Sequence, residues 1–239
     1  IMPSLKNWDN KTWISSRKYI ESFNNFVLKQ IKLNKDSKIL DIGCGRGKIV
    51  GTLSSKLRLK NKPIGIDITN HKDKDKRIKF KKIDALSFFL KNKDKFDLIL
   101  IKQTIHLLNL DEIKKLLILS KKNLSPSGRI FIFALDTDKN QLPTFKLMKI
   151  KLIKSLKRDK KILTIITKLY PYRIKKFFIY KVEMIKKNYL KMIQNRYIST
   201  LLPLSKKELL KGVKEINLKY KDNIKFNDKL ICIILKNAY

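Results

Sequence analysis

The sequence contains few of the residues that build disulfide frameworks and metal centres. Among its 239 residues are 2 cysteines, 2 histidines, 7 glycines and 6 prolines. Cys44 and Cys232 each lie within an apolar run, so we expect two free, buried or half-buried thiols in a reducing compartment rather than a disulfide. We expect no metal site.

Long hydrophobic runs are also missing. No apolar stretch approaches the roughly 18 residues that a membrane-spanning helix needs. The first residues, IMPSLKNWDNKTW, contain no apolar core of a secretory signal. We therefore expect a soluble, cytoplasmic protein, and its apolar content of 43% is sufficient for a folded core.

Acidic residues are scarce as well. The 20 aspartates and glutamates stand against 57 lysines and arginines, which gives a formal net charge of +37. Such a charge is typical of proteins that bind nucleic acids or anionic membranes. Lysine, isoleucine and asparagine are abundant while alanine, glycine and arginine are rare, which is the residue usage of an AT-rich genome. Part of the charge is therefore compositional, and the function of the remainder stays open.

The spacing of the apolar residues predicts strands and helices in alternation, after an amphipathic first helix over Trp13 to Ile31. This order is typical of an α/β fold, a parallel sheet with helices on both faces. The expected strands are residues 38–42, 63–67, 78–84, 96–102 and 129–135, and the expected helices between them are 48–57, 85–90 and 110–124.

The last third of the chain has a different pattern. Residues 137–203 form a Lys-rich region in which we expect helices at 145–156 and 175–197, closing over the ligand edge of the sheet. After them, Ser205 and Glu208 predict a capped helix over 205–220. Residues 223–226 and 229–235 then read as two strands of a hairpin that turns at Asn227-Asp228.

The predicted domains follow from these patterns. We expect residues 1–34 to form an N-terminal helical lid segment, and residues 35–136 and 204–239 to form the main domain. Residues 137–203 should form a helical, Lys-rich insertion that covers the ligand site of that domain.

Three glycines stand within five positions of the stretch KILDIGCGRGKIV, directly after the first strand. The spacing of Gly43, Gly45 and Gly47 does not match the G-x-G-x-x-G loop of dinucleotide-binding folds. Asp41, just before the loop, would also repel a pyrophosphate. A ligand with a cationic group suits the site better, because Asp41 can face an ammonium while glycine lets backbone amides approach a carboxylate.

Two further acids end the next two strands. Asp67, twenty residues past Gly47, stands where a carboxylate can accept hydrogen bonds from both hydroxyls of a ribose. Asp84 can accept from the amino group of an adenine.

The pattern resembles the class I S-adenosylmethionine-dependent methyltransferases of small-molecule type, whose motif is a strand ending in (D/E)-x-G-x-G-x-G. Five segments of about residues 38–135 resemble the family in order: LDIGCGRG, GIDI, KIDAL, FDLILIKQTIHLL and LSPSGRIFIFAL. The resemblance implies a Rossmann-like sheet of seven mostly parallel strands with an antiparallel last strand. It implies S-adenosylmethionine as cofactor, bound by Asp41, Gly43, Cys44, Gly45, Gly47, Asp67, Ile68, Asp84, Ala85 and Lys102.

The fourth strand ends in IKQTIHLL and lacks the (N/D/S)-P-P-(Y/F) tetrad seen in methyltransferases that modify base nitrogens. Lys102, Gln103 and His106 are the candidates there for catalysis or acceptor contact, and packing or capping is the alternative for His106. His71, in the charged stretch NHKDKDKR, is expected to be solvated.

The remaining candidates for the acceptor site lie outside the resembling segments. Arg196 and Tyr197 stand where the insertion returns to the main domain, and Arg suits a carboxylate or phosphate. Candidates also come from the N-terminal segment and from the loop after the fifth strand; they are Trp8, Trp13, Tyr19 and Asp138.

The sequence therefore predicts an enzyme that transfers a methyl group to a sulfur, nitrogen or oxygen of a small acceptor, with an anionic acceptor favoured by Arg196 and by the local positive charge. The alternative is an RNA methyltransferase that binds the phosphate backbone through residues 145–194, which contain sixteen basic and two acidic residues. A non-catalytic binding module is a third interpretation, and the complete set of cofactor positions argues against it.

Overall fold

Seven strands form one sheet in the computed structural model, which describes residues 12–236. Their order across the sheet is β3-β2-β1-β4-β5-β7-β6, with β1 to β5 parallel and β7 antiparallel to both of its neighbours. This confirms the predicted fold class. The strands are β1 (Ile39–Ile42), β2 (Ile64–Asp67), β3 (Lys79–Lys82), β4 (Phe96–Lys102), β5 (Leu124–Leu135), β6 (Arg173–Ile185) and β7 (Asn223–Lys236).

Helices alternate with the parallel strands as predicted, and α2 has the predicted bounds. The predicted box at Ser205 and Glu208 does begin the last helix. The helices are α1 (Arg17–Gln30), α2 (Lys48–Leu57), α3 (Ala85–Lys91), α4 (Leu110–Lys122), α5 (Lys146–Leu169), α6 (Lys186–Gln194) and α7 (Lys206–Lys219), with short 3-10 turns η1 (Trp13–Ser15), η2 (Ile105–Leu107) and η3 (Ser199–Leu201). Within residues 12–236, no helix has the length and apolarity to cross a bilayer.

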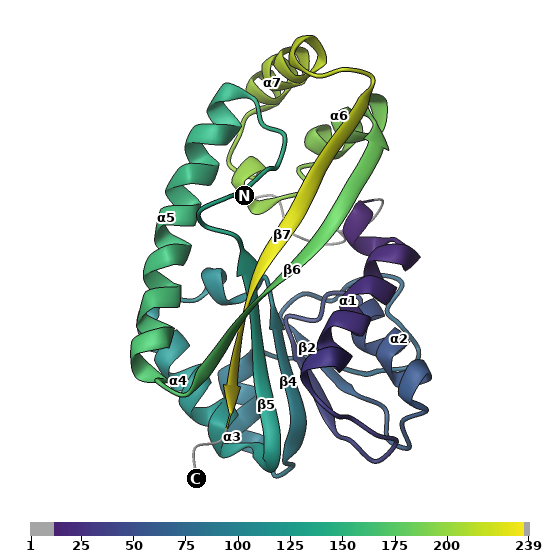
Figure 1. Cartoon of the computed structure of the whole chain (residues 1–239), viewed down its shortest axis with the longest axis vertical. Helices are drawn as coiled ribbons and strands as arrows, with labels where there is room; N and C mark the ends of the chain where they lie inside the picture. Colours follow the sequence, from purple (N-terminus) through teal and green to yellow (C-terminus); the bar gives the residue numbers. More distant parts are fainter. Residues whose placement is uncertain (1–11, 237–239) are drawn as a thin grey trace.

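Successive residues of the central strands enter two different hydrophobic cores, as the pleat of a doubly covered sheet requires. Leu98 and Leu100 of β4 pack in the core with α1 and α2, whereas Ile99 and Ile101 pack in the core with α3 and α4. The long helix α5 enters both cores, the first with Leu152 and the second with residues nearer its end. Figure 1 shows α5 running along the side of the molecule beside the sheet.

The expected helix over residues 175–197 is wrong in its first half, because residues 173–185 form the edge strand β6. Its β-branched and aromatic side chains suit a pleated surface, and Phe178 and Val182 are buried four residues apart on one face. Most of the other side chains of β6, many of them lysines, are exposed, which protects an edge strand from pairing with another chain. Only α6 in this region is helical as expected.

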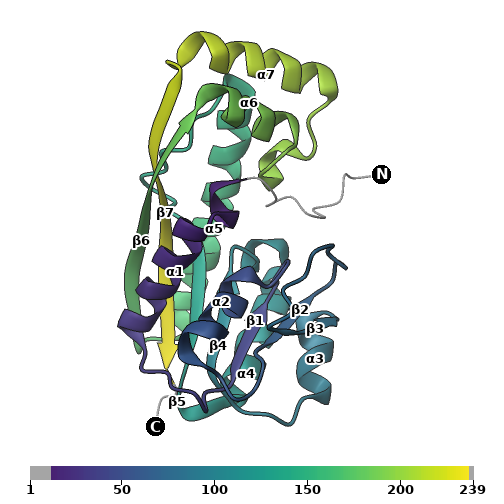
Figure 2. The same ribbon diagram turned by 90° about the vertical axis from the view of Figure 1, so that its right-hand side faces the viewer.

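The expected hairpin at the end of the chain is also wrong, because residues 223–236 form one continuous strand, β7. Instead of turning at Asn227-Asp228, the strand keeps its alternation, so that Ile224, Phe226 and Asp228 are buried on successive inward positions. The second half of β7 pairs with β5, up to Leu135 opposite Leu230. The first half pairs with β6 alone, and this ribbon projects beyond the carboxyl ends of the parallel strands toward α6 and α7 (Figures 1 and 2).

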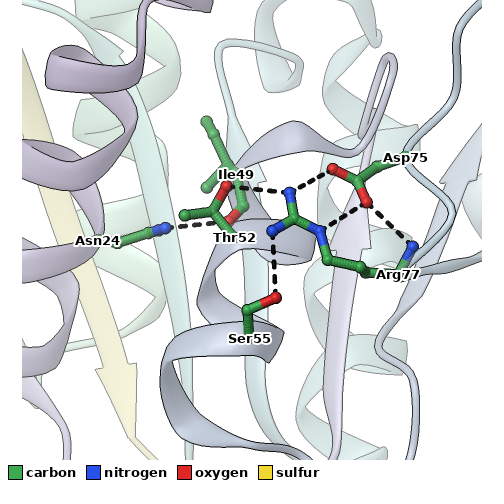
Figure 3. A network of polar contacts seen from close by, with 6 residues as sticks. All are labelled: Asn24, Ile49, Thr52, Ser55, Asp75 and Arg77. Atoms are coloured by element: carbon green, nitrogen blue, oxygen red, sulfur yellow. Dashed lines mark hydrogen bonds and ion pairs between the residues drawn. The ribbon is translucent and has the colours of Figure 1, made fainter.

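The loop between β2 and β3 is attached to α2 by a polar network around Arg77 (Figure 3). The guanidinium donates to both oxygens of Asp75, at 2.9 and 2.6 Å, and to the hydroxyls of Ser55 and Thr52 on α2. Gly51 leaves the space for Asp75, because a Cβ on Gly51 would lie 2.5 Å from that carboxyl carbon. The network holds this loop beside the end of β2, where Asp67 stands.

Candidate active site

A cavity of about 320 Å³ opens at the carboxyl ends of β1, β2 and β4. This is the edge at which parallel α/β sheets bind ligands, because loops diverge there above the strands. Predicted residues from six separate parts of the chain meet in its lining: Trp13, Asp41, Gly43, Cys44, Gly45, Asp67, Ile68, Asp84, Ala85, Lys102, Gln103, His106 and Tyr197.

The three glycines of the loop after β1 all have left-handed backbones, with φ of 71° at Gly43, 54° at Gly45 and 71° at Gly47. They serve different purposes. A Cβ at Gly43 would lie 2.2 Å from the Thr104 hydroxyl, so this glycine allows the loop to pack on the end of β4. A Cβ at Gly45 would meet no atom within 4 Å, so Gly45 presents bare backbone to the cavity.

Asp67 is bound to the glycine loop and to its own loop. Its carboxylate accepts from the amide of Gly45 at 2.9 Å and from the amide of Thr69 at 2.8 Å. His71 Nε2 lies 3.5 Å from the same carboxylate and is buried, so the expectation that His71 is solvated is wrong. Burial alone would raise the pKa of Asp67, but His71 and the two amides bring that pKa below its ordinary value. Asp67 is therefore an ionised acceptor, fixed in orientation.

Asp41 is the most deeply buried of the three strand-end acids, at 4% exposure. Burial raises the pKa of Asp41 to about 7; the Lys102 ammonium opposes the shift and Asp67 adds to it. A cation that binds beside Asp41 would stabilise its ionised form, so the site favours a positively charged group.

Asp84, at the end of β3, is exposed at the rim of the cavity. Its carboxylate accepts from the amide of Ser87 at 2.9 Å and caps α3, and these hydrogen bonds lower the pKa of Asp84. Ile68, 70% exposed, and Ala85 add apolar surface to the same rim. An apolar rim beside an acceptor oxygen suits a flat heterocycle that carries an amino group.

The end of β4 brings the three predicted catalytic candidates into the cavity. Lys102 Nζ donates to Gln103 Oε1 at 2.8 Å and lies 5.3 Å from the centre of the Tyr19 ring. Gln103 has a left-handed φ of 52°, which turns the chain away from the strand. Burial, aided by the charge of Arg158, lowers the pKa of His106 to about 4. His106 is therefore neutral near pH 7 and can accept a proton.

Trp13 and Tyr197 line the cavity together with an acid that the sequence analysis missed, Asp228 of β7. The Trp13 indole donates to Asp228 Oδ2 at 2.7 Å, and its ring lies edge-on to Tyr197 with centroids 5.4 Å apart. Burial raises the pKa of Asp228, against the hydrogen bond from Trp13 and the charge of Lys102. Asp228 takes an inward position in the alternation of β7, and that period of two was the signal that could have identified it.

The second missed acid is Asp159 on α5, which also lines the cavity. It is 6% exposed, and its Oδ1 accepts no hydrogen bond from any residue that the structure describes. Burial raises the pKa of Asp159 to about 6, with Arg158 opposing the shift. In sequence it stands in the charged run KRDKK, which suggests a solvated surface. Its helical spacing from Leu152 and Leu156 was the signal that it belongs to the buried face.

Arg196 and Asp138, two predicted acceptor residues, are not among the residues that line the cavity. The Arg196 guanidinium donates to the carbonyl of Leu204 at 2.6 Å and so holds the returning chain. Asp138 is exposed and forms an ion pair with Lys160 at 2.8 Å. The predicted preference for an anionic acceptor rested on Arg196 and on the local positive charge, and Arg196 is not in the cavity lining.

Two other predicted residues, Tyr19 and Gly47, stand apart from the cavity lining. Tyr19 is fully buried in the hydrophobic core, with its ring against Phe23 and Phe178, because it lies on the inward face of α1. Gly47 caps α2 and does not line the cavity. Trp8 lies outside the described residues.

A sequence family described as "Methyltransferase domain" matches residues 33–196, which is more than half of the chain. The chain belongs to this family. The match confirms the resemblance, and this methyltransferase has the sheet order that the resemblance implied.

Solved structures resemble this methyltransferase over almost its whole length. The plantazolicin methyltransferase BpumL, solved with a pentazolic desmethylPZN analog and SAH, is 19% identical, with 97% of this chain and 89% of that chain covered and a TM-score of 0.53. For the plantazolicin methyltransferase BamL the identity is 17%, the coverage 97% and 89%, and the TM-score 0.54. An Anabaena variabilis protein, provisionally named a methyltransferase of an antibiotic biosynthesis pathway, is 15% identical, with 90% and 96% covered and a TM-score of 0.59.

At these identities the similarity describes the fold. A comparison with curated protein sequences finds no match.

Proposed function

We propose that this methyltransferase transfers the methyl group of S-adenosylmethionine to a small acceptor within the cavity. One observation carries the proposal. The acids that end β1, β2 and β3 line a single cavity together with the open backbone of Gly45, so a ligand can contact all of them at once. The solved BpumL and BamL structures contain SAH, which supports the same choice of cofactor.

Each of the three acids would contact a different part of the cofactor. Asp41 faces the ammonium of the methionine part, and the backbone around Cys44 and Gly45 lies near its carboxylate, with Gly47 shaping the loop. Asp67 accepts from the ribose hydroxyls through the lone pairs that its two amide bonds leave open. Asp84, Ile68 and Ala85 hold the adenine.

The cofactor supplies a sulfonium-bound methyl group, which is open to direct attack by a nucleophile. The chain's own residues then align the acceptor, since alignment can contribute several kcal/mol to such a transfer. Lys102 and Gln103 hold each other at the end of β4 and fix the floor of the acceptor side. His106 is neutral, so one nitrogen of its imidazole is free to accept a hydrogen bond or a proton from the acceptor, as a weaker base than an ordinary histidine.

Two segments close the acceptor side in this proposal, as the sequence suggested. Residues 1–34 contribute Trp13 and Ile14 to the cavity, and residues 137–203 contribute Leu152, Tyr197 and their neighbours. Both segments bring apolar or aromatic side chains that exclude water from the transfer. Residues 35–136 and 204–239 carry the cofactor side, and β6 joins residues 137–203 to the same sheet.

Calorimetry with S-adenosylmethionine and with its demethylated product, SAH, tests the proposal. We expect Asp67→Ala to weaken both affinities at least about tenfold, because charge-assisted hydrogen bonds are worth about 1.5–3 kcal/mol. Asp94→Asn is the matched control, since Asp94 is half-exposed, pairs with Lys38 and precedes β4 at the opposite edge of the sheet. Wild-type protein that gives no heat with either ligand would refute the cofactor assignment.

A further inference from the structure

The acceptor side of the cavity contains a buried carboxylate with an oxygen that accepts no hydrogen bond from residues 12–236. Asp159 is 6% exposed and lines the cavity, and its Oδ1 has no hydrogen-bond partner among the described residues. We propose that the acceptor molecule carries a protonated amine or guanidinium group, and that Asp159 binds this group. The proposal rests on the proposed function and names the class of acceptor for the same site.

The other acids of the cavity already have partners. Asp67 accepts from two backbone amides, Asp84 caps α3, and Asp228 accepts from the Trp13 indole. Asp41 lies within the electrostatic reach of Lys102. Asp159 differs from all of them. Within the described part of the chain, the one cation whose charge acts on it is Arg158, whose own guanidinium is exposed and donates to the Leu108 carbonyl.

The charges around the cavity favour a cation over an anion. Five aspartates line it, namely Asp41, Asp67, Asp84, Asp159 and Asp228. Among residues 12–236, Lys102 is the single lysine or arginine in the lining, and its charge acts on both Asp41 and Asp228. An anionic acceptor would therefore enter against an excess of negative charge. This local excess contrasts with the net charge of +37 of the whole chain.

Hydroxyl groups complete a site for a nitrogen cation. Ser155 lies one turn before Asp159 on the same face of α5 and also lines the cavity. Thr200, in η3, is 8% exposed, and its Oγ1 has no partner among the described residues. An ammonium or guanidinium donates several hydrogen bonds and accepts none, so it matches a lining of carboxylate and hydroxyl oxygens. A buried ionised carboxylate needs such a partner.

The test uses three probes that share a phenyl ring and differ in charge: phenethylamine, 2-phenylethanol and 3-phenylpropionate. Their affinities for the full chain saturated with SAH are measured by ligand-observed NMR. We expect the wild type to bind the amine at least about tenfold more tightly than the alcohol or the carboxylate. Asp159→Asn should remove that preference and leave the affinity for SAH unchanged, whereas Asp94→Asn should change neither.

Different results would contradict the binding of a cation by Asp159 and the assignment of the cofactor. Equal binding of the three probes, or tighter binding of the carboxylate, would overturn the proposal. It would also be overturned if Asp159→Asn kept the preference for the amine. Failure of the wild type to bind SAH would refute the cofactor assignment instead, and that result is obtained in a separate titration before any probe is added.

Discussion

The two halves of the cavity use acidic residues in opposite ways. On the cofactor side, Asp67 and Asp84 end parallel strands and accept hydrogen bonds from backbone amides, so their charges are stabilised by the fold itself. On the acceptor side, Asp159 comes from a helix and Asp228 from an antiparallel strand, and burial raises the pKa of both. Asp67 and Asp84 therefore hold their own loops in place and remain available to a ligand. We expect the ionised form of Asp159, whose pKa burial raises, to destabilise the fold until a cation binds beside it.

The same division separates what the sequence could predict from what it could not. The ends of parallel strands meet at one edge by topology, so three acids at three strand ends identify a site without any knowledge of packing. The acceptor side is assembled from α5, η3 and β7, which are distant in sequence. Which face of α5 is buried is decided by packing that single-sequence periodicity describes only weakly.

Three predictions that differ from the structure show why packing could not be inferred from the sequence. The lysines of β6 gave it the polar character of a solvated helix, although an edge strand also exposes most of its side chains. Asn227-Asp228 resembles a turn by residue type, but pairing with β6 continues through both residues and extends β7. Arg196 was chosen for its chemistry alone, and the left-handed backbone there directs it to a carbonyl instead.

The largest expected effect is on the cofactor side, at Gly43. Gly43→Ala places a Cβ 2.2 Å from the Thr104 hydroxyl and imposes a left-handed φ on a residue that resists it. We expect the free energy of unfolding to fall by about 2–4 kcal/mol, the sum of overpacking and backbone strain. Urea denaturation measures it. Gly45→Ala is the matched variant, because its Cβ would meet no atom within 4 Å. We expect it to lose much less stability than Gly43→Ala. We also expect it to weaken the affinity for SAH by more than its small loss of stability accounts for.

The next effect concerns His106, at the junction of the two halves. We expect His106→Gln to lower kcat by about 10–100-fold with little change in KM, because a base assists the transfer without binding the ground state. Steady-state kinetics with an identified acceptor measures both constants. A variant with unchanged kcat would assign His106 to packing, which was the alternative for this residue.

On the acceptor side, removal of an acid should stabilise the protein. Burial raises the pKa of Asp159 to about 6 from an ordinary value of 3.8, so the folded state holds this proton more tightly than the unfolded state does. The resulting penalty is absent below about pH 3.8, grows as the pH rises to 6 and is constant above it. Since the cavity admits water, we expect Asp159→Asn to gain about 1–2 kcal/mol at pH 7.

Thermal unfolding of Asp159→Asn and wild type between pH 4 and 8 measures this difference, as a rise in Tm of about 2–4 °C for each kcal/mol. The gain should shrink as the pH falls through 6, where the wild-type carboxyl becomes protonated. The other ionisable groups that line the same cavity, which include Asp41, Asp67, Asp84, Lys102, His106 and Asp228, are present in both proteins and cancel in the comparison. A variant less stable than the wild type at pH 7 would show that Asp159 has a structural partner.

The smallest effect is expected at Arg196, which the structure removes from the acceptor site. Arg196→Ala loses the hydrogen bond to the Leu204 carbonyl, so we expect the free energy of unfolding to fall by about 1 kcal/mol. Arg196→Gly loses the same bond but relieves the left-handed backbone at φ 52°, so it should be less destabilised than the alanine variant. Neither change should alter the preference among the three charged and uncharged probes. A selective loss of affinity for 3-phenylpropionate in Arg196→Ala would instead return this arginine to the acceptor side and favour an anionic acceptor.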